Sequence, residues 1–240
     1  MRHPNEDLLN HPLISERYFF PRRVGLKEAT FVACKNARLA CYHLVSPQRA
    51  KTLVHFHGNG EVVADYVPDY VQSLAALGVN VFLAEYRGYG ASTGAPALGQ
   101  MLDDVEPILN ALGCAQEQVI VYGRSVGSIY AIEMAARYPK ISGIVLESGI
   151  SDVLERLLLR VRPAELGVDF ATLNSVVSAR LDHATKLGSY RGPLLVMHAA
   201  DDDLVNPSHA RQNWTAAGCD ANQKTLHLFQ HGGHNGLMSE

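Results

Sequence analysis

The protein has 240 residues, of which 47% are hydrophobic and 19% are charged, and its formal net charge is −3. This composition provides a sizeable core and excludes a globally disordered chain, and the length suits a single domain over residues 1–240. The slightly negative charge, without a basic stripe, excludes a nucleic-acid-binding protein.

Residues 1–28 form a predicted polar N-terminal arm, which lacks an apolar core of signal-peptide length. No run approaches the ~18 apolar residues that a membrane helix needs, so we expect a soluble, cytoplasmic protein without an integral membrane segment. The cysteines show neither paired spacing nor a C-x-x-C motif, and we expect them to be reduced, with none of them a metal ligand. They are Cys34, Cys41, Cys114 and Cys219.

The next elements in the chain are two strands, residues 29–34 and 38–45, which predict an antiparallel hairpin. Further strands are predicted over residues 51–56, 79–86, 119–122, 141–147, 193–198 and 224–229, and helices over residues 62–77, 97–112, 127–138 and 207–217. The alternation from residue 51 onward predicts a mostly parallel sheet with helices on both faces. In such sheets the functional residues lie at the carboxyl ends of the strands.

Residues 151–189 interrupt this alternation, because they separate two strands by more chain than one helix needs. Their apolar residues predict two or three helices. The segment leaves the sheet on the side to which the strands point, so it is a candidate helical cap over the site. Packing on the edge of the sheet is an equally good interpretation.

The sequence QVIVYGRSVGSIY, residues 118–130, predicts a buried strand, a sharp turn and the start of a helix. The turn matches G-x-S-x-G, with Ser125 as the candidate nucleophile. The flanking glycines suit a strained turn, where neighbouring side chains would clash. The same turn places the N–H of Val126 at a helix N-terminus, where it can donate to a negatively charged oxygen.

A serine nucleophile needs a base and an acid. In folds with a G-x-S-x-G turn, the acid follows the serine in the chain and the histidine comes last. The candidate acids at strand ends are Glu147, Asp152 and the run of three carboxylates at residues 201–203. After the last predicted strand come two histidines, His231 and His234. His234 follows two glycines, in a loop that can bring an imidazole over the strand ends.

The turn His57-Gly58-Asn59-Gly60 offers a second oxyanion donor, the N–H of Asn59, besides that of Val126. His57 belongs to the turn, and we expect it to be structural. His55 lies within a strand, and we expect a core histidine with satisfied hydrogen bonds.

Six short stretches together resemble the α/β-hydrolase superfamily, in particular its compact serine hydrolases with small caps. They are HFHGNG at 55–60, EYRGYGAS at 85–92, YGRSVG at 122–127, LES at 146–148, MHAADDDLVNP at 197–207 and GGHN at 232–235. The resemblance extends from residue 29 to the end of the chain. It implies Arg87 as a structural anchor and a catalytic set in which the acid lies four residues after His198. That set is Ser125 as nucleophile, His234 as base, Asp202 as acid, and Asn59 and Val126 as oxyanion donors.

The resemblance implies a serine hydrolase that cleaves small carboxylic esters or thioesters through an acyl-enzyme, without a cofactor or a metal. A peptidase and a cofactor-free haloperoxidase are alternatives on the same fold. A non-catalytic binding protein that keeps the fold is another, because a fold does not fix a function. The sequence does not indicate an oligomeric state.

Overall fold

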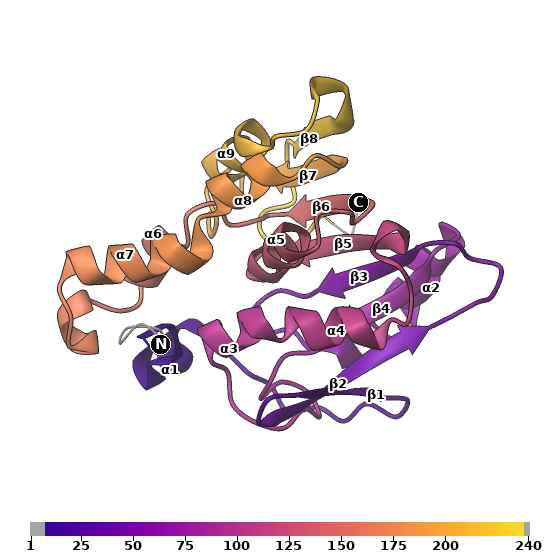
Figure 1. Ribbon diagram of the computed structural model, residues 1–240, viewed down its shortest axis with the longest axis horizontal. Helices are drawn as coiled ribbons and strands as arrows, with labels where there is room; N and C mark the ends of the chain where they lie inside the picture. The colour runs from indigo at the N-terminus through magenta and orange to yellow at the C-terminus, as the bar shows by residue number, and fades with distance from the viewer. Residues whose placement is uncertain (1–7, 238–240) are drawn as a thin grey trace.

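The computed structural model describes residues 8–237, and within them eight strands form one sheet. The strands are β1 (Thr30–Cys34), β2 (Ala37–Leu44), β3 (Thr52–Phe56), β4 (Asn80–Ala84), β5 (Val119–Arg124), β6 (Gly143–Glu147), β7 (Leu194–Ala199) and β8 (Lys224–Phe229). Their order across the sheet is β1-β2-β4-β3-β5-β6-β7-β8 (Figure 1). β2 runs antiparallel to β1 and β4, and all other neighbours are parallel, which confirms the predicted sheet and hairpin.

The α-helices of the described residues are α1 (Pro12–Tyr18), α2 (Asp69–Ala76), α3 (Leu98–Asp103), α4 (Val105–Ala111), α5 (Gly127–Arg137), α6 (Val153–Leu158), α7 (Phe170–Leu181), α8 (His183–Ser189) and α9 (Ser208–Ala216). The 3-10 helices are η1 (Leu8–Asn10), η2 (Val63–Tyr66), η3 (Gln116–Gln118), η4 (Pro163–Leu166) and η5 (Ala221–Gln223). None of these helices, within residues 8–237, is long and apolar enough to cross a membrane.

Helices cover both faces of the sheet, because successive side chains of a strand point to opposite faces. In β3, Leu53 packs with Val71 and Leu74 of α2 in one hydrophobic cluster. Val54 and Phe56 instead belong to a larger cluster on the other face, which includes residues of α3, α4 and α5. The sheet is therefore the middle layer of a three-layer structure, as the alternating sequence pattern predicts.

Two predicted helices are each divided in the structure, in both cases near a proline. The helix predicted over 62–77 is η2 followed by α2, because Pro68 cannot donate a backbone hydrogen bond and the residue before it is extended. The helix predicted over 97–112 is α3 followed by α4, with a turn at Asp104. Pro107 has no N–H to donate to the carbonyl of Asp103, so the hydrogen-bond ladder is interrupted there.

The predicted polar N-terminal arm contains two helices, η1 and α1, and its residues 1–7 lie outside those described. Pro12 occupies the first turn of α1, and Nδ1 of His11 accepts a hydrogen bond from the N–H of Leu13 at 3.2 Å. Leu9 and Ile14 are fully buried in the larger hydrophobic cluster. The part of the arm from residue 8 to residue 19 therefore packs on the rest of the molecule.

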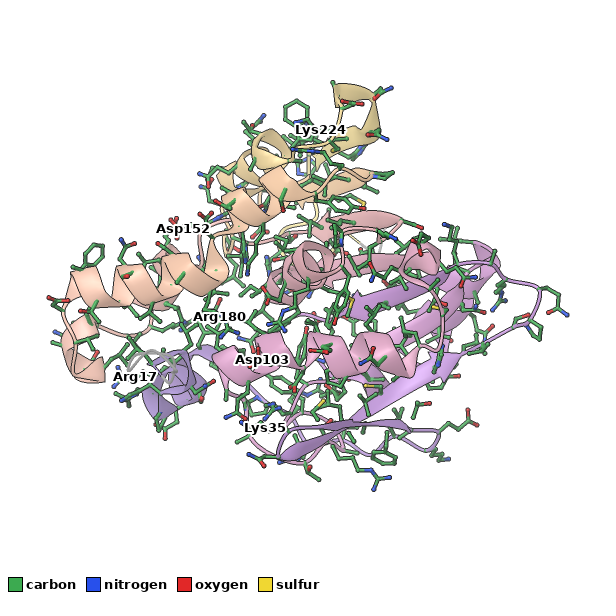
Figure 2. All side chains as sticks on the ribbon, viewed as in Figure 1. Arg17, Lys35, Asp103, Asp152, Arg180 and Lys224 are labelled. Atoms are coloured by element: carbon green, nitrogen blue, oxygen red, sulfur yellow. The ribbon has the colours of Figure 1, made fainter. Side chains whose placement is uncertain are left out.

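The predicted cap segment, residues 151–189, contains three α-helices, α6, α7 and α8, as expected, and one short 3-10 helix, η4. α8 packs against α5 and α9, whereas α6 and α7 extend beyond the sheet beside α1 (Figure 1). Two ion pairs hold this projecting part. Arg180 lies 3.0 Å from Asp103 of α3 (Figure 2), and Arg17 of α1 lies 3.0 Å from Glu165.

Two residues expected to be structural make buried polar contacts. Nε2 of His57 lies 2.7 Å from Oε1 of Glu85, and the guanidinium of Arg87 binds both carboxylate oxygens of Asp104. His55 differs from the expectation, because it is buried but neither ring nitrogen has a hydrogen-bond partner. The rings of three tyrosines surround it, so it behaves as an aromatic core residue, and burial lowers its pKa well below the ordinary value.

Candidate active site

Ser125 lies on the sharp turn between β5 and α5, with a left-handed φ of 50°. This strained conformation is tolerated because the glycines on either side leave room for the turn. A Cβ atom on Gly123 would lie 2.6 Å from the carbonyl oxygen of Gly127, and one on Gly127 would lie 2.0 Å from that of Phe56. The N–H of Ser125 also donates to the carbonyl of Glu147 on β6, at 2.9 Å. Both glycines are therefore required by sterics.

His234 lies in the loop after β8 and reaches Ser125 across 109 positions of sequence. Its Nε2 atom is 2.9 Å from Oγ of Ser125, and its Nδ1 atom is 2.8 Å from Oδ2 of Asp202. Gly232 and Gly233 precede it with φ values of 126° and 55°, which other residues rarely adopt. A proton on Nδ1 that is donated to the carboxylate leaves Nε2 free to accept one from the serine.

Asp202 is a buried carboxylate with both oxygens occupied. Oδ1 accepts hydrogen bonds from the N–H groups of Leu204 and Val205, at 2.9 and 2.8 Å. Oδ2 faces His234 and also lies 3.1 Å from Nε2 of His198. Burial alone would raise the pKa of Asp202, but the hydrogen bonds from His198, His234 and Val205 outweigh it and hold the pKa well below the usual range. The carboxylate is therefore ionised wherever the protein is folded near neutral pH.

The other candidate acids and the other candidate base have different environments. Glu147 is buried beside Arg124 and Tyr122, and Asp152 caps α6 by accepting from the N–H of Glu155 at 2.9 Å. His231 is 83% exposed and lies near Asp201. Of the residues considered from the sequence, the structure brings Ser125, His234 and Asp202 together.

A pocket of about 150 Å³ opens beside Ser125, and both predicted oxyanion donors line it. Val126 directly precedes α5, so its N–H stands at the positive end of that helix. The side chain of Asn59 is fixed by the arm: its Nδ2 donates to the carbonyl of Tyr18, and its Oδ1 accepts from the N–H of Phe20. The full lining is Tyr18, Phe20, Asn59, Ser125, Val126, Ile150, Arg156, Arg160, Leu204 and Val205.

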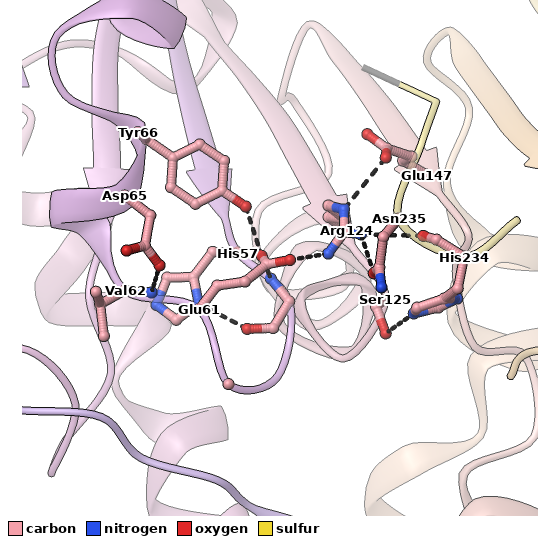
Figure 3. A network of polar contacts seen from close by, with 12 residues as sticks. His57, Glu61, Val62, Asp65, Tyr66, Arg124, Ser125, Glu147, His234 and Asn235 are labelled. Atoms are coloured by element: carbon pink, nitrogen blue, oxygen red, sulfur yellow. Dashed lines mark hydrogen bonds and ion pairs between the residues drawn. The ribbon is translucent and has the colours of Figure 1, made fainter. Parts of the chain in front are cut away.

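Arg124 is a site residue that the sequence analysis misses. It is the variable position before the serine in G-x-S-x-G, and it is buried at the end of β5. Its Nη2 atom donates to the carbonyl of His234 at 3.0 Å and to Oδ1 of Asn235 at 2.8 Å (Figure 3). An arginine at the end of a buried apolar strand is the one sequence signal that indicates it, because a buried charge needs partners.

The remaining nitrogens of Arg124 join two carboxylates. Nε lies 3.2 Å from Oε1 of Glu147, and Nη1 pairs with Glu61. Glu61 in turn accepts from the N–H of Gly58 at 2.6 Å and from the hydroxyl of Tyr66 (Figure 3). One guanidinium thus connects the histidine loop, the end of β6 and the turn that carries Asn59.

Tyr18 and Phe20 are also missed by the sequence analysis, since they belong to the predicted arm. The spacing of Leu9, Ile14 and Tyr18 indicates a helical segment that packs on the domain, and this signal could have placed the arm near the site. For metals, no group of three His, Cys, Asp or Glu side chains within the described part of the chain is arranged to hold an ion.

Comparison with solved structures shows the class of fold. The esterase Est1E from Butyrivibrio proteoclasticus, solved with ferulic acid bound, aligns over 86% of this chain and 91% of its own, with a TM-score of 0.68 and 17% identity. An esterase from Pyrococcus furiosus aligns over 89% and 90% of the two chains, with a TM-score of 0.67 and 17% identity. The fold is therefore that of the α/β-hydrolase superfamily.

Sequence comparison gives the family. Residues 47–169 match the model of the serine aminopeptidase S33 family of hydrolases, and the chain belongs to that family. The human α/β-hydrolase domain-containing protein 17B is 27% identical over 180 residues, which are 73% of this chain and 58% of that protein. Protein bem46 of Schizosaccharomyces pombe is 28% identical over 195 residues, 79% of this chain and 63% of that protein. The chain thus spans less than two thirds of the length of either relative.

Proposed function

We propose that the protein is a serine hydrolase that cleaves carboxylic ester or thioester bonds through an acyl-enzyme. The observation that supports this most is the hydrogen-bonded line from Ser125 Oγ to His234 Nε2, 2.9 Å, and from His234 Nδ1 to Asp202 Oδ2, 2.8 Å. It joins a nucleophile, a base and an acid in the geometry that acyl transfer needs.

In the proposed reaction, Oγ of Ser125 attacks the substrate carbonyl while Nε2 of His234 takes its proton. The N–H groups of Asn59 and Val126 stabilise the negative oxygen of the tetrahedral intermediate, and one such donor is typically worth about 2.7–4 kcal/mol. His234 then returns the proton to the leaving alcohol or thiol. Water repeats the sequence and releases the acid. Asp202 fixes the ring of His234 and stabilises its charged form.

A peptidase is the second candidate, because the family model is named for serine aminopeptidases. An aminopeptidase binds the ammonium group at the N-terminus of a peptide, which calls for a carboxylate near the nucleophile. The pocket beside Ser125 is lined by two arginines and by no Asp or Glu. The charge of the pocket therefore favours an ester or thioester of a small molecule over a peptide N-terminus.

The cytoplasmic location of the protein stays a prediction.

Replacing the nucleophile tests the proposal. Ser125→Ala is expected to abolish hydrolysis of p-nitrophenyl esters, with a loss in kcat of about 10⁶-fold, as when other triad nucleophiles are removed. The control is Ser175→Ala, on the exposed side of α7, which should keep full activity. A Ser125→Ala protein that retains a tenth of the wild-type rate would show that the nucleophile is elsewhere.

A fluorophosphonate probe separates this proposal from a binding protein that keeps only the fold. The probe reacts with an activated serine, so the wild type should be labelled at Ser125 and the Ser125→Ala variant should not. A wild-type protein that stays unlabelled would favour the non-catalytic alternative.

A further inference from the structure

The cap side of the pocket carries two arginines, Arg156 of α6 and Arg160 just after it. Both line the pocket that contains Ser125. They are four residues apart, and the N–H of Arg160 donates to the carbonyl of Leu157 at 2.9 Å, so the helical turn continues to Arg160. Residues at this spacing lie on the same side of a helix. Both arginines therefore line the pocket from one short segment, α6 and the turn after it.

Neither guanidinium is neutralised by the described protein. Within residues 8–237, no Asp or Glu oxygen forms an ion pair with Arg156 or Arg160, whereas the neighbouring Arg17 and Arg162 both pair with Glu165. The closest aromatic partner of Arg160 is Phe20, with its guanidinium carbon 5.6 Å from the ring centroid. The two arginines therefore line the pocket without an ion-pairing carboxylate among the residues that the structure describes.

The rest of the pocket offers no compensation, because its other lining residues are apolar, aromatic or uncharged polar groups. Tyr18, which also lines the pocket, lies within electrostatic reach of both arginines. Burial raises the pKa of its hydroxyl to about 12, and the charges of Arg156 and Arg160 act in the opposite direction. The two guanidiniums are thus close enough to the pocket wall to act on a group bound there.

We propose that Arg156 and Arg160 form an anion subsite beside Ser125, which selects substrates that carry a carboxylate or a phosphate group near the bond to be cleaved. The inference rests on the proposed ester or thioester hydrolysis and names its substrate class. Arginine presents a planar fork of N–H donors that matches both anions, and such charge-assisted hydrogen bonds are stronger than neutral ones. A neutral substrate of the same size would leave both charges to the solvent.

Two matched pairs of esters test the subsite and locate the anion. p-Nitrophenyl hemiglutarate and p-nitrophenyl pentanoate have acyl chains of equal length and differ in a carboxylate on the acyl side. 4-Acetoxybenzoate and its methyl ester differ in a carboxylate on the leaving-group side. We expect kcat/KM of the wild type to be about tenfold higher for the anionic member of one pair, and this preference to fall with ionic strength.

Arg156→Met and Arg160→Met should each remove most of that preference, because the anionic ester slows much more than the neutral ester. Arg162→Met is the matched control, because that arginine is exposed and pairs with Glu165 outside the pocket. It should keep the wild-type preference. A wild type that turns over both members of both pairs equally, or variants that slow both members alike, would overturn the subsite.

These outcomes are separable from failure of the proposed hydrolysis. Labelling of Ser125 by a fluorophosphonate and turnover of the neutral esters report on the nucleophile alone. If the neutral esters react and no anionic preference exists, the subsite is wrong and the hydrolase is right. If no ester reacts and Ser125 is not labelled, both proposals are wrong.

Discussion

Three consecutive carboxylates, Asp201, Asp202 and Asp203, have three different environments in this protein. Asp202 is buried and contacts His234, whereas Asp201 is exposed and its Oδ1 accepts from the N–H of Gly233 at 2.8 Å. Asp203 is exposed to solvent. Since successive side chains in a fixed loop point in different directions, only one of the three can orient the imidazole.

Replacement of each carboxylate by its amide should therefore have unequal effects. Asp202→Asn is expected to lower kcat/KM by about 10⁴-fold, because the histidine loses the acceptor that sets its tautomer. Asp201→Asn should have a small effect, since an amide oxygen can still accept from Gly233, and Asp203→Asn should have none. Ester hydrolysis under identical conditions measures all three. Similar losses in the three variants would mean that Asp202 is not the orienting acid.

At the scale of elements, the loop that carries His234 is held by its neighbours. It follows β8 without regular secondary structure, and Arg124 at the end of β5 donates to two of its acceptors. Asp201, which follows β7, also contacts this loop by accepting a hydrogen bond from the N–H of Gly233. The position of the imidazole therefore depends on the ends of two parallel strands, which lie at the same edge of the sheet.

Arg124→Met should lower kcat by about 10²-fold with little change in KM, because a small displacement of the base costs about that much. It should also lower the melting temperature, since Glu61 and Glu147 lose their buried partner. Asn235→Ala removes one loop contact without leaving a buried charge, so it should reduce kcat less and leave the melting temperature unchanged. Kinetics and thermal unfolding of both variants provide the measurement.

Arg124→Lys serves where the methionine variant does not fold, because it keeps the charge and loses the forked geometry. It should fold and still lose much of kcat. Full activity in a folded Arg124 variant would show that the loop needs no support from this residue.

At the scale of the whole molecule, buried histidines connect the parts of the chain and make its stability depend on pH. His183 begins α8, is 1% exposed, and its Nδ1 lies 2.8 Å from the carbonyl of Ile150, in the segment that leads from β6 to the cap. Burial lowers the pKa of His183 to about 4. The unfolded chain binds a proton at this residue from about pH 6.5 downward, whereas the folded protein excludes it until about pH 4.

Stability should therefore rise with pH between about 4 and 6.5, because the unfolded state binds more protons over that range. When only the pH is lowered, from 7 to 4, this residue should reduce the free energy of unfolding by about 3 kcal/mol. His183→Asn keeps a donor for the carbonyl of Ile150 and removes the titration. Urea unfolding at both pH values should show a smaller change in the free energy of unfolding for the variant than for the wild type. Equal changes in the two proteins would contradict the assignment.

The sequence by itself determined most of the local structure of this protein and its candidate nucleophile. The β-branched run of β5 and the glycines around Ser125 encode the turn within a few residues, so Ser125 could be predicted directly as the candidate nucleophile. The strands and the two glycines before His234 are also encoded in short stretches of sequence, and the order of the motifs follows from the chain itself. The predictions of two long helices were wrong for a local reason too, because Pro68 and Pro107 remove hydrogen-bond donors that the apolar pattern does not reveal.

Only the tertiary structure decided how distant segments share the site. Arg124 contacts the loop of His234 across 110 positions of sequence, and Asn59 contacts Tyr18 across 41. His55 and Arg156 have no local signature, because the partners that a side chain finds, or fails to find, lie on other elements. Hydrophobic periodicity reports which face of an element is buried. It does not report what lies opposite, and the charge and shape of the pocket depend on that.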